Sequence, residues 1–248
     1  MKIKIVKYKR EALYSYTLGM APTIEMIKHR RNLINRIFIH PRYVIKDNLY
    51  DIYDICDKTS LPYTVAEKIF NRLSAKENVY VIGVFNKFVA NIKKEKPHVV
   101  LVNPSNTGNL GTIVRTGLGF GLRDYAIIRP GVDIYDPKTI RSSMGAFFHV
   151  RFSYYDSFDQ YRESFIEHKI YPFMLDGKIN LKAIKESPEP TPFSLVFGNE
   201  GSGLPGIFHD YGDSIYIPHN IEIDSLNLSV AFGIVANVFY EKENKYGK

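Results

Sequence analysis

A glycine-rich segment late in the chain combines a permissive backbone with one acidic side chain. It runs Phe197-Gly-Asn-Glu-Gly-Ser-Gly-Leu204 and directly follows the apolar run Ser194–Phe197. Three glycines in six residues let the backbone approach a ligand closely and present N–H groups to it. Glu200 can accept hydrogen bonds from ribose hydroxyls or pair with a cation such as Arg115. We interpret the segment as a ligand-binding loop, with a flexible surface turn as the alternative.

A second polar segment follows another apolar run, His98–Val102. It reads Pro104-Ser-Asn-Thr-Gly-Asn-Leu-Gly111, and Arg115 lies six residues after Asn109. That spacing is close to two helical turns, so both side chains could approach one site and hold a phosphate or a ribose through fixed donors. The alternative, of equal weight on this segment alone, is a helix N-cap followed by an arginine that faces solvent.

The third segment, residues 217–231, carries polar side chains inside an apolar run. Ser225, Asn227 and Ser229 interrupt it, and polar groups this close to a core need partners. A bound cofactor and the two preceding loops would provide them. We expect Asp224 or Ser225 to cap the last helix. His219 is a candidate base, although a lone loop histidine is more often incidental.

The glycines of Gly117-Leu-Gly-Phe-Gly121 have the spacing of many cofactor loops, but their order is reversed. A cofactor loop joins a strand to the helix that follows it, whereas these glycines follow the predicted helix Leu110–Leu118 and precede a strand. We therefore interpret them as a left-handed helix C-cap and a tight return.

Hydrophobic periodicity predicts the elements that must position these segments. Helices are predicted at Tyr14–Asn35, Leu49–Lys58, Val65–Leu73, Leu110–Leu118, Phe158–Lys169 and Ser225–Glu241. Strands are predicted at Arg36–His40, Val79–Phe85, His98–Val102, Tyr125–Ile128, Tyr171–Leu175, Ser194–Phe197 and Ser214–Ile217. Such alternation predicts an α/β fold with a parallel sheet covered on both faces, and ligands of such sheets bind beyond the carboxyl ends of the strands.

Charge divides the chain of 248 residues into two parts. Residues 1–96 contain 19 basic and 9 acidic residues, a net charge of +10, whereas the remainder contains 14 basic and 17 acidic residues, a net charge of −3. A polyanion such as RNA gains long-range attraction and counterion release from the first part. The charged stretch Lys93-Lys-Glu-Lys-Pro97 predicts a linker, so we expect domains at residues 1–92 and 98–248 with residues 93–97 between them.

Other features limit the class of protein. The single cysteine, Cys56, can form neither an internal disulfide nor a thiolate metal site, which fits a reducing, cytoplasmic setting. The basic N-terminus is not followed by an apolar stretch long enough for a signal peptide or a membrane span. We expect neither a membrane nor a metal to be involved.

Taken together, the three polar segments resemble the motif set of the TrmH (SpoU) family in the SPOUT superfamily. Asn109-Leu-Gly-Thr-Ile-Val-Arg115 resembles the first motif, Gly198-Asn-Glu-Gly-Ser-Gly-Leu204 the second, and Ile217–Ala231 the third. Arg141-Ser-Ser-Met-Gly-Ala146 resembles a segment often found between the first two. Residues 1–90 are similar, more weakly, to an L30e-like RNA substrate-binding domain, best seen in residues 16–25.

This resemblance implies an RNA ribose-2′-O-methyltransferase that uses S-adenosyl-L-methionine. It also implies a deep trefoil knot in the C-terminal domain and a homodimer. By position, the family's catalytic residues correspond to Asn109, Arg115, Glu200, Ser225 and Asn227. Its cofactor-binding positions correspond to Gly198, Ile217 and Leu226. The third motif departs from the family at residues 219–221, so the resemblance does not predict the shape of that loop.

The family proposal makes the arginine the base in methyl transfer. A guanidinium group in water keeps its proton up to a pKa above about 12, which makes such a role demanding. Our hypothesis is that Arg115 mainly fixes the adjacent phosphate and ribose oxygen. The L30e-like likeness favours ribosomal RNA over transfer RNA as substrate. The alternatives are a non-catalytic RNA-binding protein of the same fold and a base methyltransferase.

Overall fold

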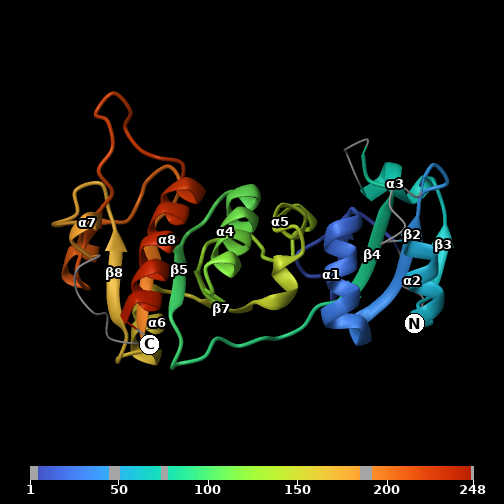
Figure 1. Cartoon of the computed structure of the whole chain (residues 1–248), viewed down its shortest axis with the longest axis horizontal. Helices are drawn as coiled ribbons and strands as arrows, with labels where there is room; N and C mark the ends of the chain where they lie inside the picture. Colours follow the sequence, from blue (N-terminus) through green and yellow to red (C-terminus); the bar gives the residue numbers. More distant parts are fainter. Residues whose placement is uncertain (1–4, 45–50, 74–77, 185–191, 247–248) are drawn as a thin grey trace. The chain divides into compact units, whose positions relative to one another are not determined.

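The computed structural model describes residues 5–44, 51–73, 78–184 and 192–246 (Figure 1). The chain divides into two compact units. The first unit comprises Met1–Phe88 and Asp133–Phe148, and the second unit comprises Val89–Val132 and His149–Lys248. The linear division into 1–92, 93–97 and 98–248 differs from these units, because composition follows chain order and cannot show that residues 133–148 return to the first unit.

The first unit contains a four-stranded sheet in the order β1-β4-β2-β3. β4 is antiparallel to β1 and β2, and β3 is parallel to β2. Its strands are β1 (Tyr14–Leu18), β2 (Ile34–Ile39), β3 (Tyr63–Val65) and β4 (Val81–Asn86). Its helices are α1 (Met20–Arg30), η1 (Arg31–Leu33), α2 (Ile52–Thr59), α3 (Lys68–Leu73) and α5 (Pro137–Ser142). The strands predicted near β2 and β4 are confirmed. Residues 49 and 50 of the predicted helix Leu49–Lys58 lie outside the described residues.

The predicted helix Tyr14–Asn35 is wrong over its first residues, which form β1. Consecutive residues of β1 are buried on both faces, Ser15 and Thr17 at 0% exposure and Tyr16 at 1%. Tyr14-Ser-Tyr-Thr-Leu18 alternates apolar and hydroxyl side chains, which is the period of a strand, but this signal covers only five residues and runs directly into the longer helical pattern of α1. Gly19 then adopts a φ of +108°, which separates β1 from α1.

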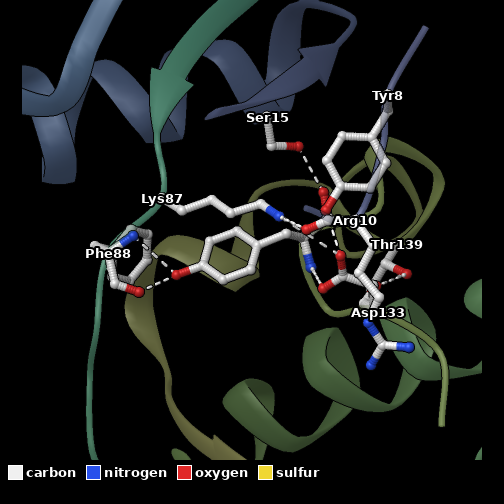
Figure 2. Close-up of polar contacts among 8 residues, drawn as sticks. Tyr8, Arg10, Ser15, Lys87, Phe88, Asp133 and Thr139 are labelled. Atoms are coloured by element: carbon white, nitrogen blue, oxygen red, sulfur yellow. Dashed lines mark hydrogen bonds and ion pairs between the residues drawn. The ribbon is translucent and has the colours of Figure 1, made fainter. Parts of the chain in front are cut away.

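Residues 133–148 are fixed to the first unit by a hydrogen-bonded cluster around Asp133 (Figure 2) and by further bonds of Tyr135. The Tyr8 hydroxyl donates to the Asp133 carboxylate, and Lys87 Nζ lies 3.7 Å from Asp133 Oδ2. Ser15 Oγ donates to the Tyr135 carbonyl at 2.5 Å. Burial lowers the pKa of Lys87, although Asp133 opposes that shift. The helix that follows, α5, packs against β1, so this segment is an integral part of the first unit.

The second unit contains a seven-stranded sheet in the order β7-β6-β5-β10-β8-β11-β9, and every pairing in it is parallel. Its strands are β5 (His98–Val102), β6 (Asp124–Ile128), β7 (Arg151–Tyr155), β8 (Lys169–Phe173), β9 (Ile179–Asn180), β10 (Phe193–Phe197) and β11 (Ile215–Tyr216). Its helices are α4 (Thr107–Gly119), α6 (Phe158–Ser164), α7 (Leu181–Ile184), η4 (Gly206–Asp210) and α8 (Leu228–Tyr246), and η3 (Ala146–His149) bridges the two units in sequence. The predicted parallel sheet is confirmed.

Helices cover both faces of this sheet, as predicted. On one face, alternate residues of β5, β6 and β10 join the α6 side chains Phe158 and Tyr161 in one apolar cluster. On the other face lie α4 and α8, side by side (Figure 1). There the rings of Phe197 and Phe232 lie 5.5 Å apart, and those of Phe193 and Phe239 lie 5.1 Å apart. Burying one such phenyl group contributes about 2 kcal/mol.

The glycines at the C-terminal end of α4, residues 117, 119 and 121, belong to a helix C-cap, as predicted. Gly121 adopts a left-handed φ of +76° and donates to the Leu118 carbonyl at 3.1 Å, while Leu122 donates to the Gly117 carbonyl at 2.8 Å. These paired bonds define a Schellman motif. A Cβ on Gly117 would lie 2.0 Å from the Tyr125 hydroxyl oxygen. The run therefore closes a helix onto the sheet and does not face the cavity described below.

Other predicted boundaries need correction. The helix predicted at Phe158–Lys169 ends at Ser164, because Lys169 already begins β8. β7 was not predicted at all, since it is an edge strand with only one fully buried residue, Phe152. The trefoil knot implied by the resemblance stays a prediction. No helix within the described ranges is both long and apolar enough to cross a membrane.

The predicted linker is anchored to the second unit. His98 Nε2 lies 2.9 Å from the Lys93 carbonyl, and His168 Nε2 lies 2.7 Å from the Lys94 carbonyl. The Lys93 N–H donates to Asp124 Oδ1 at 2.9 Å. Burial lowers the pKa of His98 to about 4, so this ring is neutral near pH 7 and donates to the carbonyl. Residues 93 and 94 are thus part of the second unit's structure.

Candidate functional site

The glycine-rich loop after β10 folds back on itself as a tight turn. Asn199 and Gly203 exchange two backbone hydrogen bonds, of 3.3 and 2.9 Å. The turn brings Gly203 so close to Gly198 that a Cβ on Gly198 would lie 2.2 Å from the Gly203 carbonyl carbon. Gly203 itself has a φ of +67°. Two of the three glycines are therefore needed to form the turn itself.

Asn199 holds this loop against the loop that follows β5. Its Nδ2 donates to the Asn103 carbonyl at 2.8 Å. Its Oδ1 accepts the backbone N–H groups of Gly201 and Ser202, at 2.9 and 3.2 Å. This role of Asn199 was not predicted, although asparagine side chains commonly bond to the backbone of nearby turn residues. β5 and β10 are neighbours in the sheet, which is why the two loops meet.

Glu200 is bonded to the segment that begins α4. Its carboxylate accepts the Ser105 N–H at 2.9 Å, the Ser105 hydroxyl at 2.6 Å, the Asn106 N–H at 3.1 Å and Asn109 Nδ2 at 3.3 Å. Burial raises the pKa of Glu200, but the bonds from Ser105 and Asn109 outweigh it and hold the pKa below its ordinary value. The carboxylate is therefore charged at neutral pH, and its partners are these donors, with no contact to Arg115.

Asn109 links Glu200 to the start of α8. Asn227 Nδ2 donates to Asn109 Oδ1 at 3.3 Å, while Asn109 Nδ2 donates to Glu200. Asn227 Oδ1 accepts the Ser229 N–H at 2.9 Å and the Ser229 hydroxyl at 2.7 Å. Asn227 therefore caps α8, and the expected cap at Asp224 or Ser225 is wrong. The three predicted segments are joined in the order Glu200, Asn109, Asn227.

The N-terminus of α4 is capped by Asn106. Its Oδ1 accepts the N–H groups of Gly108 and Asn109, at 2.8 and 3.0 Å. This is the N-cap alternative weighed from the sequence, and it leaves the Asn109 side chain free to reach Glu200. An asparagine N-cap stabilises a helix by about 1 kcal/mol.

A cavity of about 390 Å³ lies at the carboxyl ends of β8, β10 and β11. It is lined by Phe173, Met174, Leu175, Asp176, Phe197, Gly198, Asn199, Glu200, Gly201, Ser202, Gly203, Leu204, Ile215, Ile217, His219, Ser225, Leu226, Leu228 and Ala231. Five predicted site residues are among them, namely Gly198, Glu200, Ile217, Ser225 and Leu226. The His219 ring is held by a 2.9 Å contact between its Nδ1 and the Ile217 carbonyl.

Among the predicted site residues, Asn109 and Asn227 are bonded to the cavity residue Glu200 directly or through each other, whereas Arg115 is not. It is exposed, it does not line the cavity, and it makes no hydrogen bond or ion pair with any residue that the structure describes. Six residues along α4 correspond to a rotation of about 600°, which leaves Asn109 and Arg115 about 120° apart around the helix axis. Asn109 therefore faces Glu200, while Arg115 faces outward.

The site has the features of a pocket for a small organic ligand. Its walls combine apolar side chains, such as Ile217 and Leu226, with backbone groups of the glycine-rich loop and two acidic side chains, Asp176 and Glu200. Its volume lies within the range of small-molecule sites. Asp176 was not predicted as a site residue, because no glycine-rich or amide-rich segment precedes it in the sequence.

Comparison with known proteins places the chain among RNA-modifying enzymes. The model of the SpoU rRNA methylase family matches residues 96–237. The chain is 27% identical over 232 residues to a protein of Bacillus subtilis named 23S rRNA (guanosine(2553)-2′-O)-methyltransferase, covering 84% of this chain and 90% of that protein. It is 30% identical over 149 residues to a putative tRNA (cytidine(34)-2′-O)-methyltransferase of Listeria monocytogenes, covering 59% of this chain and 88% of that protein.

The fold is also shared with solved structures. A crystal structure of an AdoMet-bound rRNA methyltransferase from Sinorhizobium meliloti aligns with a TM-score of 0.75 at 22% identity. The alignment covers 94% of this chain and 88% of that one. The likeness therefore extends over both units.

Proposed function

Because the chain belongs to the SpoU rRNA methylase family, it is an S-adenosylmethionine-dependent RNA methyltransferase, and we propose that it methylates a ribose 2′-hydroxyl of ribosomal RNA. We choose ribosomal RNA because of how much of each relative's length this chain matches. The relative named for 23S rRNA matches 84% of this chain and 90% of its own length. The relative named for tRNA is matched over 149 residues that make up 88% of it, so it is too short to contain both units.

The cavity suits S-adenosylmethionine. Its apolar wall, formed by Ile217, Leu226 and Ala231, can bury an adenine ring. A Cβ on Gly198 would meet the Gly203 backbone, which shows how closely the two strands of this loop pass at the cavity edge. We propose that Gly198, Ile217 and Leu226 contact the cofactor, as their positions in the motifs imply. When bound, the cofactor supplies an electrophilic methyl group.

The residues beside the cavity then position the acceptor hydroxyl. Methyl transfer to an alcohol requires in-line approach of the oxygen and loss of its proton. Glu200 is charged and bonded to four donors, so its role is to fix the orientation of Asn109. The Asn109–Asn227 pair in turn fixes the start of α8, where Ser225 and Leu226 line the cavity. The exposed guanidinium of Arg115 is available to a phosphate or ribose oxygen of RNA.

The first unit is proposed to capture RNA. Residues 1–96 carry a net charge of +10, and the remainder carries −3. Exposed basic side chains of this unit include Arg36, whose Nη1 donates to Thr64 Oγ1 at 2.7 Å, and Tyr63 and Tyr80 are 36% and 37% exposed. A unit that offers both cations and exposed aromatic rings suits unpaired RNA, because cations bind its phosphates and bases stack on such rings.

Point substitutions in the full chain test this division of roles. A chain cut at Pro97 would remove the packing partners of residues 133–148, so its behaviour would not report on RNA binding alone. We expect Arg36→Ala and Arg42→Ala to weaken RNA binding and to lower the salt slope by about 0.7 for each phosphate of unpaired RNA that is no longer neutralised. Lys182→Ala, an exposed site in the second unit, is the matched control. An equal effect of all three substitutions would contradict the assignment.

We also propose a cytoplasmic homodimer without a metal. Val230 and Ile234, about one turn apart on α8, are 53% and 39% exposed, which leaves an apolar face for a second copy of the chain. Sedimentation analysis of the purified protein tests this directly. A monomer at micromolar concentration would contradict it.

The deciding experiment for the proposed function is to map 2′-O-methyl sites in total RNA from cells with and without this protein. We expect one ribosomal RNA position to lose its methyl group when the protein is absent. Loss at a tRNA position would replace the proposed substrate. Mass spectrometry of digested product nucleosides separates ribose from base methylation. A non-catalytic RNA-binding protein would show neither a change in methylation nor affinity for S-adenosylmethionine in calorimetry.

A further inference from the structure

Asp176, His209 and Ser214 form a hydrogen-bonded chain that ends at the cavity. His209 Nε2 lies 3.1 Å from Asp176 Oδ2, and His209 Nδ1 lies 3.0 Å from Ser214 Oγ. The Asp176 carboxylate can only accept, so Nε2 carries the ring proton, and Nδ1 of the neutral imidazole accepts from the Ser214 hydroxyl, whose oxygen also accepts the Lys178 N–H at 3.2 Å. The histidine therefore receives a hydrogen bond at Nδ1 and donates its Nε2–H to Asp176.

These three residue types also occur in nucleophilic triads, but the burial rules out that chemistry here. Ser214 is 1% exposed, so its hydroxyl cannot reach a substrate. The accessible end of the chain is Asp176, whose side chain is 75% exposed and which lines the cavity, whereas the His209 side chain is 21% exposed. The hydrogen-bonded series therefore begins at a buried serine, passes through the histidine and ends at a carboxylate that a ligand can contact.

The backbone holds Asp176 in a fixed place. It lies in a turn after β8 in which Gly177 donates to the Met174 carbonyl at 3.3 Å, and Met174 donates to the Ile215 carbonyl at 2.9 Å. A Cβ on Gly177 would lie 2.4 Å from the Ile215 carbonyl carbon, so the turn is pressed against β11. A carboxylate on such a turn, oriented by a second side chain, loses little freedom when it binds a ligand.

The two acidic side chains of the cavity, Glu200 and Asp176, differ in how many of their hydrogen-bond acceptor positions are unused by the protein. Glu200 is bonded to four protein donors. Asp176 uses one oxygen for His209, and a carboxylate has about four acceptor positions. The hydrogen bond from His209 lowers the pKa of Asp176, so the group is charged at neutral pH. S-adenosylmethionine in this cavity would offer two kinds of hydrogen-bond donor to the Asp176 carboxylate, its α-ammonium group and its ribose hydroxyls.

We propose that Asp176 binds a hydrogen-bond donor of the bound S-adenosylmethionine, and that His209 and Ser214 are positioning residues that orient it. This inference rests on the proposed function. It assigns a side-chain contact to a cofactor site whose other predicted contacts, at Gly198, Ile217 and Leu226, are apolar or come from the backbone.

Calorimetry with two product analogues tests the contact and identifies the donor. S-adenosylhomocysteine carries both the α-ammonium group and the ribose diol, whereas 5′-methylthioadenosine carries only the diol. We expect Asp176→Ala to weaken S-adenosylhomocysteine binding by about tenfold or more, the usual effect of a hydrogen bond to a charged group. Unchanged 5′-methylthioadenosine binding then assigns the ammonium group, and an equal loss assigns the ribose.

The matched control is Asp210→Asn, which removes a carboxylate from an exposed position next to His209 outside the cavity. We expect it to bind both analogues as the unmodified protein does. A thermal melt first shows that the Asp176→Ala variant is folded. If this variant then bound S-adenosylhomocysteine with unchanged affinity, the inference would be overturned while the proposed function stood. If the unmodified protein bound neither analogue, the proposed function would fail, and the inference with it.

A double-mutant cycle tests the positioning role of His209. We expect His209→Ala to weaken S-adenosylhomocysteine binding less than Asp176→Ala does, and His209→Gln, which keeps an N–H donor, to recover part of the affinity. Combining His209→Ala with Asp176→Ala should weaken binding no further than Asp176→Ala alone. Additive effects would show that the histidine does not act through the aspartate.

Discussion

Glu200 Oε1 accepts a hydrogen bond from Asn109 Nδ2 at 3.3 Å, across a separation of 91 residues in the chain. This contact joins the loop after β10 to the helix after β5, and Asn227 continues it to the start of α8. All three lie where the carboxyl ends of neighbouring parallel strands meet. The site is thus held together by polar side chains whose partners come from different strands.

Gly198→Ala should abolish cofactor binding. The added Cβ would lie 2.2 Å from the Gly203 carbonyl carbon, so the turn that lines the cavity must open. Gly201→Ala is the matched control, because the nearest atom to its Cβ, Asn199 Oδ1, lies at 3.5 Å, an ordinary van der Waals distance. Calorimetry with S-adenosylhomocysteine measures both. Equal affinities in the two variants would show that the turn does not need to be this tight.

Asn227 combines two roles that two substitutions separate. Asn227→Ala removes the α8 cap and the bond to Asn109, so we expect stability to fall by about 1 kcal/mol and activity to be abolished. Asn227→Ser keeps a capping oxygen but is too short to reach Asn109. It should therefore restore the melting temperature without restoring methylation. Full activity in the serine variant would argue that the Asn109 bond is dispensable.

Arg115→Lys tests whether the arginine acts through its planar guanidinium. Lysine keeps the charge but cannot bind a phosphate and a ribose oxygen with a rigid pair of donors. We expect methylation to fall by at least about tenfold, while S-adenosylhomocysteine affinity stays unchanged, because Arg115 does not line the cavity. Retained activity together with unchanged RNA affinity would sink the positioning hypothesis.

Stability should depend on pH through Glu200. Its pKa is lowered in the folded protein, so its contribution to stability is present above its unfolded pKa and is lost as pH falls through the folded pKa. We expect the free energy of unfolding of the native protein to fall more steeply below about pH 4.5 than that of Glu200→Gln. Urea unfolding at several pH values measures this. Glu222→Gln, exposed and outside the cavity, serves as the control, and parallel curves for the native protein and Glu200→Gln would contradict the expectation.

The sequence by itself determined the buried central strands of the second unit. The runs at His98–Val102 and Ser194–Phe197 are apolar throughout because those strands are buried on both faces, and this pattern is visible without a structure. The glycines at 117–121 could be assigned to a helix end from chain order alone. The same was not true of β1, since its alternation of apolar and hydroxyl residues covers only five positions before the helical pattern of α1 begins.

The tertiary structure decided which polar groups meet. Asn106 and Asn227, and not Asp224 or Ser225, cap the two helices of the site. Glu200 bonds Asn109 and not Arg115, since helix rotation turns the arginine outward. Strand order places the loops after β5, β8, β10 and β11 together. Hydrogen bonds between such loops depend on positions in space that periodicity cannot encode, and the Asp176–His209 contact became visible only for that reason.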